Sequence, residues 1–193
     1  MGTEKTIENQ DTRPSLSTSR LDLRPFQIED EEAVFEICRE KAIAASTRTI
    51  PHPYPRAQAE HWIKQHPEMW LDGKAAVFAI CNRLTGRLIG AVGLQIDRED
   101  QNAELGYWID KTEWGQGYCT EAAQETIRFA FEELSLHKVH AHFMTSNPAS
   151  GRVMEKIGMK QEGVLRGHVR KWGQFHDIVF YGLLKKDFMS CQK

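Results

Sequence analysis

The stretch that decides the fold is AELGYWIDKTEWGQGYCTEAAQETIRFAFEEL, residues 103–134. Its first part, Ala103–Asp110, alternates apolar residues with others, which is typical of a strand that is buried on one face. Its last part, Ala123–Leu134, carries apolar residues at helical spacing and therefore predicts an amphipathic helix. Between them, Trp114–Thr120 is a turn with two glycines that leads directly into this helix.

The glycine turn has the chemistry of an anion site. The first backbone N–H groups of a helix have no partner within it, and the helix dipole adds positive potential behind them. Glycine at positions 115 and 117 removes the Cβ atoms that would keep a ligand away from the backbone. We therefore expect the turn to bind a phosphate. The residues alone leave a second interpretation, a tight connection only, because neither common nucleotide motif is matched.

A wider resemblance favours the phosphate. The segment GYWIDKTEWGQGYCTEA, residues 106–122, resembles the acetyl-CoA-binding motif of the GNAT N-acetyltransferases, Q/R-x-x-G-x-G/A. It is most similar to the RimJ/RimL-type branch, which acetylates protein N-termini and, in relatives, small amines. Thr112 departs from the motif, where Gln or Arg is usual. Further similar segments are TSRLDLRP (18–25), IPHPYPRAQAEHWI (50–63) and NPASGRVMEKIGMKQEG (147–163), so that the resemblance covers about residues 18–188.

Length and composition limit the class of protein. A chain of 193 residues with a formal net charge of −2 favours one soluble domain and argues against a nucleic-acid surface. No apolar run approaches the roughly 20 residues of a membrane span, and the N-terminus lacks a signal-peptide pattern. Four scattered cysteines without a C-x-x-C pair favour a reducing cytoplasm and no metal site. We expect a flexible arm over 1–19, one domain over 20–188 and a tail over 189–193.

The expected fold is α/β with a mixed, mostly antiparallel sheet. The strand at 103–110, its helix and a strand at 138–145 form a βαβ unit, so these two strands should be parallel. The proline loop at 49–55 precedes a short helix that should end at Pro67. The resemblance implies the GNAT architecture, in which the two parallel strands splay apart, pantetheine lies in the gap and helices cover both faces of the sheet. Homodimerisation is expected from family habit alone.

The same resemblance implies the acetyl-CoA site. Backbone amides of the turn would bind the pyrophosphate, and a backbone N–H near Trp108 or Ile109 would stabilise the oxyanion. Asn147 either contacts the pantetheine amides, caps the next helix, or does both. The residues matched to cofactor binding are Trp108, Ile109, Trp114, Gly115, Gln116, Gly117, Tyr118, Cys119, Thr120, Asn147 and Ser150.

Catalysis needs a base for the substrate ammonium and an acid for the departing thiolate. Glu104 is the first candidate for the base, although it could equally face solvent or pair with an arginine. His140 and His142, on one face of the neighbouring strand, could relay the proton, and His168 is a further candidate. The RimL branch implies Ser150 as the acid. Met154 stands where many GNAT enzymes have a tyrosine as the acid. Val169 stands where the RimL branch has its proposed catalytic glutamate, and this departure counts against a RimL-like substrate and mechanism.

Other interpretations of the site stay open. Cys119 lies where a helix dipole would lower a thiol pKa, which makes a covalent mechanism conceivable. The acceptor, a peptide N-terminus or a small amine, would contact residues around the proline loop and in the end hairpin, namely His52, Tyr54, Trp62 and Asp177. Asp177 and Trp62 could instead be structural. The alternative function is a non-catalytic acyl-CoA-binding sensor or scaffold, which the missing tyrosine and glutamate would favour.

Overall fold

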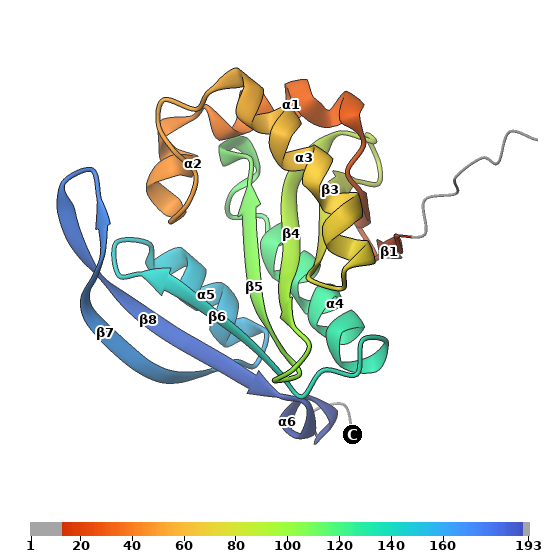
Figure 1. Ribbon diagram of the computed structural model, residues 1–193, viewed down its shortest axis with the longest axis vertical. Coiled ribbons are helices and arrows are strands. Elements are labelled where there is room, and N and C mark those ends of the chain that lie inside the picture. The colour runs from red at the N-terminus through yellow and green to blue at the C-terminus, as the bar shows by residue number, and fades with distance from the viewer. Residues whose placement is uncertain (1–12, 191–193) are drawn as a thin grey trace, which may run out of the picture.

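The computed structural model describes residues 13–190 as one eight-stranded sheet between two layers of helices (Figure 1). The strand order is β1-β2-β3-β4-β5-β6-β8-β7, and every neighbouring pair is antiparallel except β5–β6. The strands are β1 Leu16–Ser17, β2 Leu21–Pro25, β3 Ala75–Asn82, β4 Leu88–Asp97, β5 Asn102–Ile109, β6 Lys138–Met144, β7 Lys160–Lys171 and β8 Gln174–Leu184. The predicted mixed α/β fold is confirmed.

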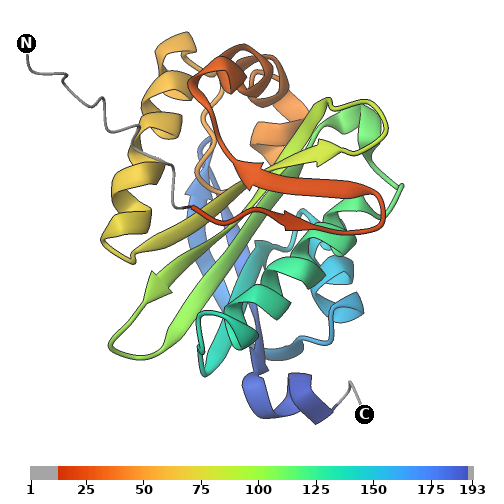
Figure 2. The same cartoon turned by 90° about the vertical axis from the view of Figure 1, so that its right-hand side faces the viewer.

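Helices cover both faces of the sheet, each over its own apolar cluster (Figures 1 and 2). On one face lie α1 Glu31–Cys38, α2 Lys41–Ser46 and α3 Arg56–Leu71; on the other lie α4 Tyr118–Glu132 and α5 Pro148–Lys156. Short 3₁₀ turns at η1 Ile28–Asp30 and η2 Lys111–Glu113, and α6 Lys185–Ser190, complete the elements. No helix in the described part of the chain is long and apolar enough to cross a membrane.

The parallel pair separates almost as soon as it forms. β5 and β6 pair only at Asn102–Lys138, Ala103–Val139 and Glu104–His140, although β5 runs on to Ile109 and β6 to Met144. Figure 1 shows the two strands diverging above this point. Beyond Glu104, therefore, β5 has no partner strand on one side, and this edge of its backbone faces the region between the two diverging strands.

Several local expectations were wrong. Residues 13–19 are not a flexible arm: Leu16 is buried, and Thr18 Oγ1 donates to Glu121 Oε1 at 2.6 Å. The helix of the proline region continues through Pro67 to Leu71. α2 was not anticipated, and α6 occupies the start of the predicted tail. The rest of the predicted arm and tail, residues 1–12 and 191–193, lies outside the described residues.

A buried histidine under α3 gives a first testable prediction. His66 is 3% exposed, lies against the rings of Phe26 and Trp62, and neither ring nitrogen hydrogen-bonds to a described residue. Burial, helped by the charge of Arg13, lowers the pKa of His66 from 6.5 to about 4. The unfolded chain therefore takes up this proton first as the pH falls. The free energy of unfolding should therefore keep its full value above pH 6.5. Between pH 6.5 and pH 4 it should fall by roughly 3 kcal/mol because of this histidine.

Denaturant unfolding between pH 4 and 7 checks this prediction. His66→Leu should flatten the pH dependence of the free energy of unfolding by about that amount. The matched control is His61→Leu, an exposed position on the same helix, which should leave the dependence as it is. An unchanged slope in His66→Leu would show that another group dominates acid sensitivity.

Candidate active site

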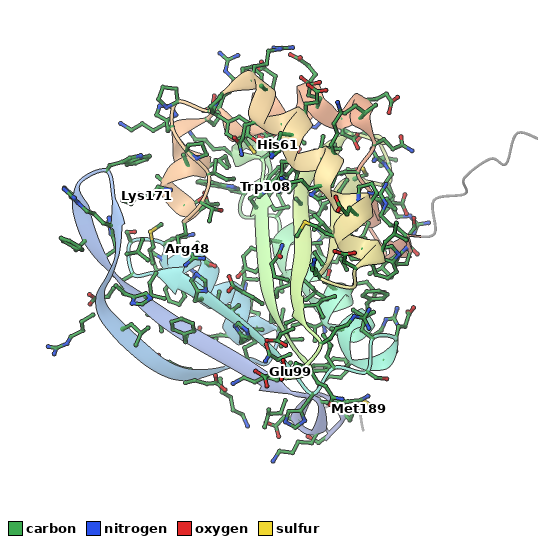
Figure 3. The ribbon with its side chains drawn as sticks, viewed as in Figure 1. Arg48, His61, Glu99, Trp108, Lys171 and Met189 are labelled. Atoms are coloured by element: carbon green, nitrogen blue, oxygen red, sulfur yellow. The ribbon has the colours of Figure 1, made fainter. Side chains whose placement is uncertain are left out.

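A cavity of about 490 Å³ opens where β5 and β6 diverge. Its floor comes from β4, β5 and β6, and its walls come from α3, α5 and the segment between α2 and α3. Figure 3 shows Trp108 and Arg48 on two sides of this region. Among the described residues that line it, Glu104 is the only carboxylate and Arg48 is the only lysine or arginine. The cavity therefore has a lining of mixed polarity that includes one acidic side chain and one arginine.

Two ionisable groups meet at the base of the gap. Glu104 Oε1 lies 3.4 Å from His142 Nδ1, one side chain from each of the diverging strands. Burial lowers the pKa of His142, while Glu104 opposes this effect. His142 Nδ1 is buried and makes no hydrogen bond to a described residue. A neutral imidazole with a free ring nitrogen beside a carboxylate can accept a proton. His140 is not among the residues that line the cavity.

A hydroxyl pair lies on another wall of the cavity. Ser150 Oγ on α5 is 3.0 Å from Tyr107 Oη on β5, and the same phenol lies 3.1 Å from the Ser150 carbonyl oxygen. A phenol has a single proton, so Tyr107 donates either to the carbonyl, with Ser150 Oγ–H turned towards the phenol oxygen, or to Ser150 Oγ, which leaves the serine proton free to point into the cavity. Burial raises the pKa of Tyr107, which keeps it protonated. Sequence reasoning missed this role, because Tyr107 counted only as an apolar strand position.

The glycine turn is built to receive a ligand at the start of α4. Gly115 and Gly117 have left-handed φ angles of 80° and 82°. A Cβ at Gly115 would meet nothing within 4 Å, so space is open in front of the turn. The backbone N–H groups of residues 116–120 have no acceptor among the described residues. These unpaired donors and this open space fit a pyrophosphate group.

Neighbouring side chains fix the turn from behind. Trp114 Nε1 donates to the Ile109 carbonyl at 2.8 Å, and Arg20 Nη1 donates to the Gln116 carbonyl at 3.0 Å. Arg20 also pairs with Glu121 at 2.6 Å and lies over the Tyr118 ring. Since these contacts use carbonyls and side chains, they leave the N–H groups free to bind a ligand.

The backbone of β5 supplies a donor to the gap. Asp110 N donates to the Ile89 carbonyl of β4, at 2.8 Å. Because alternate N–H groups of an antiparallel strand point to opposite sides, the N–H of Ile109 points towards the gap and that of Trp108 towards β4. Of the two predicted oxyanion donors, the geometry favours Ile109.

Two local interpretations fail. Burial raises the pKa of Cys119 to about 12, so the expected lowering by the helix dipole is wrong, because loss of hydration outweighs the dipole. Thr120 follows it in the first turn of α4. Asn147 does not cap α5 with its side chain: its Nδ2 donates to the Ser46 carbonyl at 2.9 Å.

The predicted acceptor residues separate into two groups. Tyr54 and Trp62 line the cavity. His52 is exposed and faces the Trp172 ring, while His168 is exposed on β7, and neither lines the cavity. Asp177 accepts the Gly167 N–H at 2.7 Å and so stabilises the bulged hairpin of β7 and β8.

Comparison with known proteins agrees with this geometry. Residues 20–160 match the family model of the acetyltransferase (GNAT) domain. A curated relative, the uncharacterized N-acetyltransferase p20 of Bacillus licheniformis, is 29% identical over 90% of this chain and 98% of its own length.

Two solved structures share the fold. RimL, described as a ribosomal L7/L12 α-N-protein acetyltransferase in complex with coenzyme A, has a TM-score of 0.81 at 18% identity, covering 89% of this chain and 98% of its own. Spermidine N-acetyltransferase from Vibrio cholerae, in complex with coenzyme A and spermine, has a TM-score of 0.78 at 21% identity, covering 89% and 99%. The family model spans most of the chain, and the protein therefore belongs to the GNAT acetyltransferases, enzymes that use acetyl-CoA.

Proposed function

We propose that the protein transfers the acetyl group of acetyl-CoA directly to a primary amine, as a RimJ/RimL-type enzyme. The observation that carries this proposal is the pairing of Glu104 and His142 across the splayed strands, in a cavity that also holds Ser150 and Tyr107. The resemblance of residues 106–122 to the RimJ/RimL-type branch supports the assignment to that branch.

Each group of the cavity has a defined task in this reaction. Acetyl-CoA would supply the thioester: the amine nitrogen would add to its carbonyl carbon to form the C–N bond, and the C–S bond would break as the resulting oxyanion collapses. The Glu104–His142 pair takes the proton that the substrate ammonium must lose before its nitrogen can attack. The Ile109 N–H donates to the carbonyl oxygen as negative charge develops there. Ser150 Oγ–H would protonate the departing sulfur, the Tyr107 phenol would stabilise the resulting serine oxygen by donating a hydrogen bond to it, and Ser150 would regain its proton from solvent.

Different residues would bind different parts of acetyl-CoA. The N–H groups from Gln116 to Thr120 would bind the pyrophosphate, with Gly115 and Gly117 giving it access. Trp114 supports the turn through the Ile109 carbonyl. Cys119 is protonated and packed against the core, which supports direct transfer over an acyl-cysteine route.

A thiol-release assay with acetyl-CoA tests the proposal. The acceptors would be peptides with varied N-termini, polyamines and aminoglycosides. Turnover with one class identifies the acceptor. A large thermal shift with acetyl-CoA and no thiol release from any amine would contradict the proposal and favour an acyl-CoA-binding sensor. The single-domain boundaries and homodimerisation stay predictions.

The acid role of Ser150 makes a separate prediction. In Ser150→Ala the Tyr107 phenol keeps its bond to the residue-150 carbonyl, so the fold should hold. We expect kcat to fall about 10²-fold with little change in KM for acetyl-CoA. Ser146→Ala, at an exposed position just before α5, is the matched control. Steady-state kinetics would speak against the role if the two variants behaved alike.

A further inference from the structure

The cavity contains one guanidinium that the reaction does not use. Arg48 lies in the segment between α2 and α3 and lines the cavity that also holds Glu104. Its side chain has no hydrogen bond or ion pair with any described residue, whereas Arg24 and Arg128 are held by carboxylates. Figure 3 shows Arg48 beside the gap, below α2. A guanidinium without a partner at the wall of a binding cavity is available to a ligand.

The backbone that carries Arg48 is held in place from the other half of the chain. Asn147 Nδ2 donates to the Ser46 carbonyl at 2.9 Å. Lys171 Nζ, at the end of β7, donates to the Thr47 carbonyl and, at 3.3 Å, to the Ile50 carbonyl. Three carbonyls around Arg48 are thus bound, and none of these contacts uses its side chain. These contacts fix the backbone from which the exposed Arg48 side chain reaches the cavity.

Charge in the cavity restricts the acceptor. Burial is the largest cause that lowers the pKa of His142, and the charge of Arg48 also lowers it, so the guanidinium acts on the Glu104–His142 pair. A polyamine would bring a second cation into a lining that has one carboxylate and one arginine. An acceptor with an amine and an anion matches both charges. Arginine binds a carboxylate through two parallel N–H···O bonds, which also fixes its orientation.

We propose that the acceptor is a primary amine that also carries a carboxylate, and that Arg48 binds this carboxylate while the amine reaches Glu104. The proposal rests on the proposed function of the same cavity. Arg48 is then a specificity-determining residue, and Lys171 and Asn147 position it through the backbone of residues 46–50.

Matched pairs of ligands test this inference. Each pair has the same primary amine and differs only in a carboxylate or a carboxamide, in an amino-acid series and in a short-peptide series with Asp or Asn after the N-terminal residue. Equilibrium binding to the protein in the presence of coenzyme A is measured by calorimetry, and kcat/KM by thiol release. We expect the carboxylate to be preferred about 10- to 100-fold in at least one series. A preference in the amino-acid series would indicate a small-molecule acceptor, and a preference in the peptide series would indicate a peptide acceptor.

The variant Arg48→Gln should remove this preference by weakening the carboxylate compounds alone. Arg166→Gln, which removes an exposed arginine of β7 outside the cavity, should leave the preference intact. Equal binding of carboxylate and carboxamide in both series, or equal weakening of both by Arg48→Gln, would overturn the inference. Carboxylate-selective binding without any thiol release would retain the Arg48 site and refute the proposed transferase reaction, so the two failures are distinct.

Discussion

Gly117→Asp is expected to abolish acetyl-CoA binding without unfolding the protein. Gly117 has a φ of 82°, and a Cβ there would meet only Arg20 Nη2, at 3.6 Å. Aspartate tolerates the left-handed region better than most residues, so the added strain is on the order of 1 kcal/mol. Its carboxylate would project where the pyrophosphate must approach the free N–H groups of α4. Like charges in contact cost several kcal/mol, which is an affinity loss of about 100-fold or more.

Calorimetric titration with acetyl-CoA measures this effect. The matched control is Gly86→Asp: Gly86 also has a positive φ, of 69°, its Cβ would meet nothing within 4 Å, and it lies in the exposed turn between β3 and β4. The two variants introduce the same side chain into a similar backbone conformation. We expect comparable losses of stability, with acetyl-CoA affinity lost only in Gly117→Asp. Wild-type affinity in that variant would refute the placement of the cofactor at the turn.

The periodic spacing of apolar residues made the central part of the fold predictable. The alternation around Leu105 and the helical spacing around Ile127 predicted the right elements because both residues are buried in the apolar cluster between the sheet and α4. The β5–α4–β6 unit then requires a parallel pair. Short elements gave no such signal: β1 has 2 residues and α2 has 6, and they depend on tertiary contacts of Leu16 and Ile43 rather than on local propensity.

Expectations drawn from local sequence alone failed at those site residues whose environment is set by tertiary packing. The helix dipole at Cys119 is overcome by burial, which depends on neighbours distant in sequence. Asn147 has the residue type of a helix cap, yet its amide bonds Ser46 instead, 101 positions earlier. Tyr107 looks like any apolar strand residue until α5 brings Ser150 to its hydroxyl. Sequence reasoning found Glu104, Ser150 and the turn because each lies within, or next to, a recognisable motif.

Glu104→Gln is expected to lower kcat/KM for the amine by about 10²- to 10⁴-fold near neutral pH. Glutamine keeps the size of the side chain but cannot take the ammonium proton, and it removes the charge 3.4 Å from His142. Affinity for acetyl-CoA should be unchanged, because Glu104 lies at the base of the gap and the glycine turn begins α4. The control Glu99→Gln removes an exposed carboxylate from the turn joining β4 and β5, which does not line the cavity (Figure 3).

The pH dependence of the rate distinguishes two explanations for a slow Glu104→Gln variant, namely loss of the general base and a change in the shape of the cavity. Without Glu104, only acceptor molecules that have already lost their proton can react, so the rate of the variant should rise as the pH passes the pKa of the amine, about 8 for a peptide N-terminus. Wild type should rise less over this range, because the Glu104–His142 pair removes the proton at lower pH. As the pH rises towards that pKa, the deficit of Glu104→Gln relative to wild type should therefore shrink, by up to about tenfold per pH unit. A deficit that stays constant from pH 6 to 9 would assign Glu104 to holding the acceptor and leave proton removal to His142 or to water.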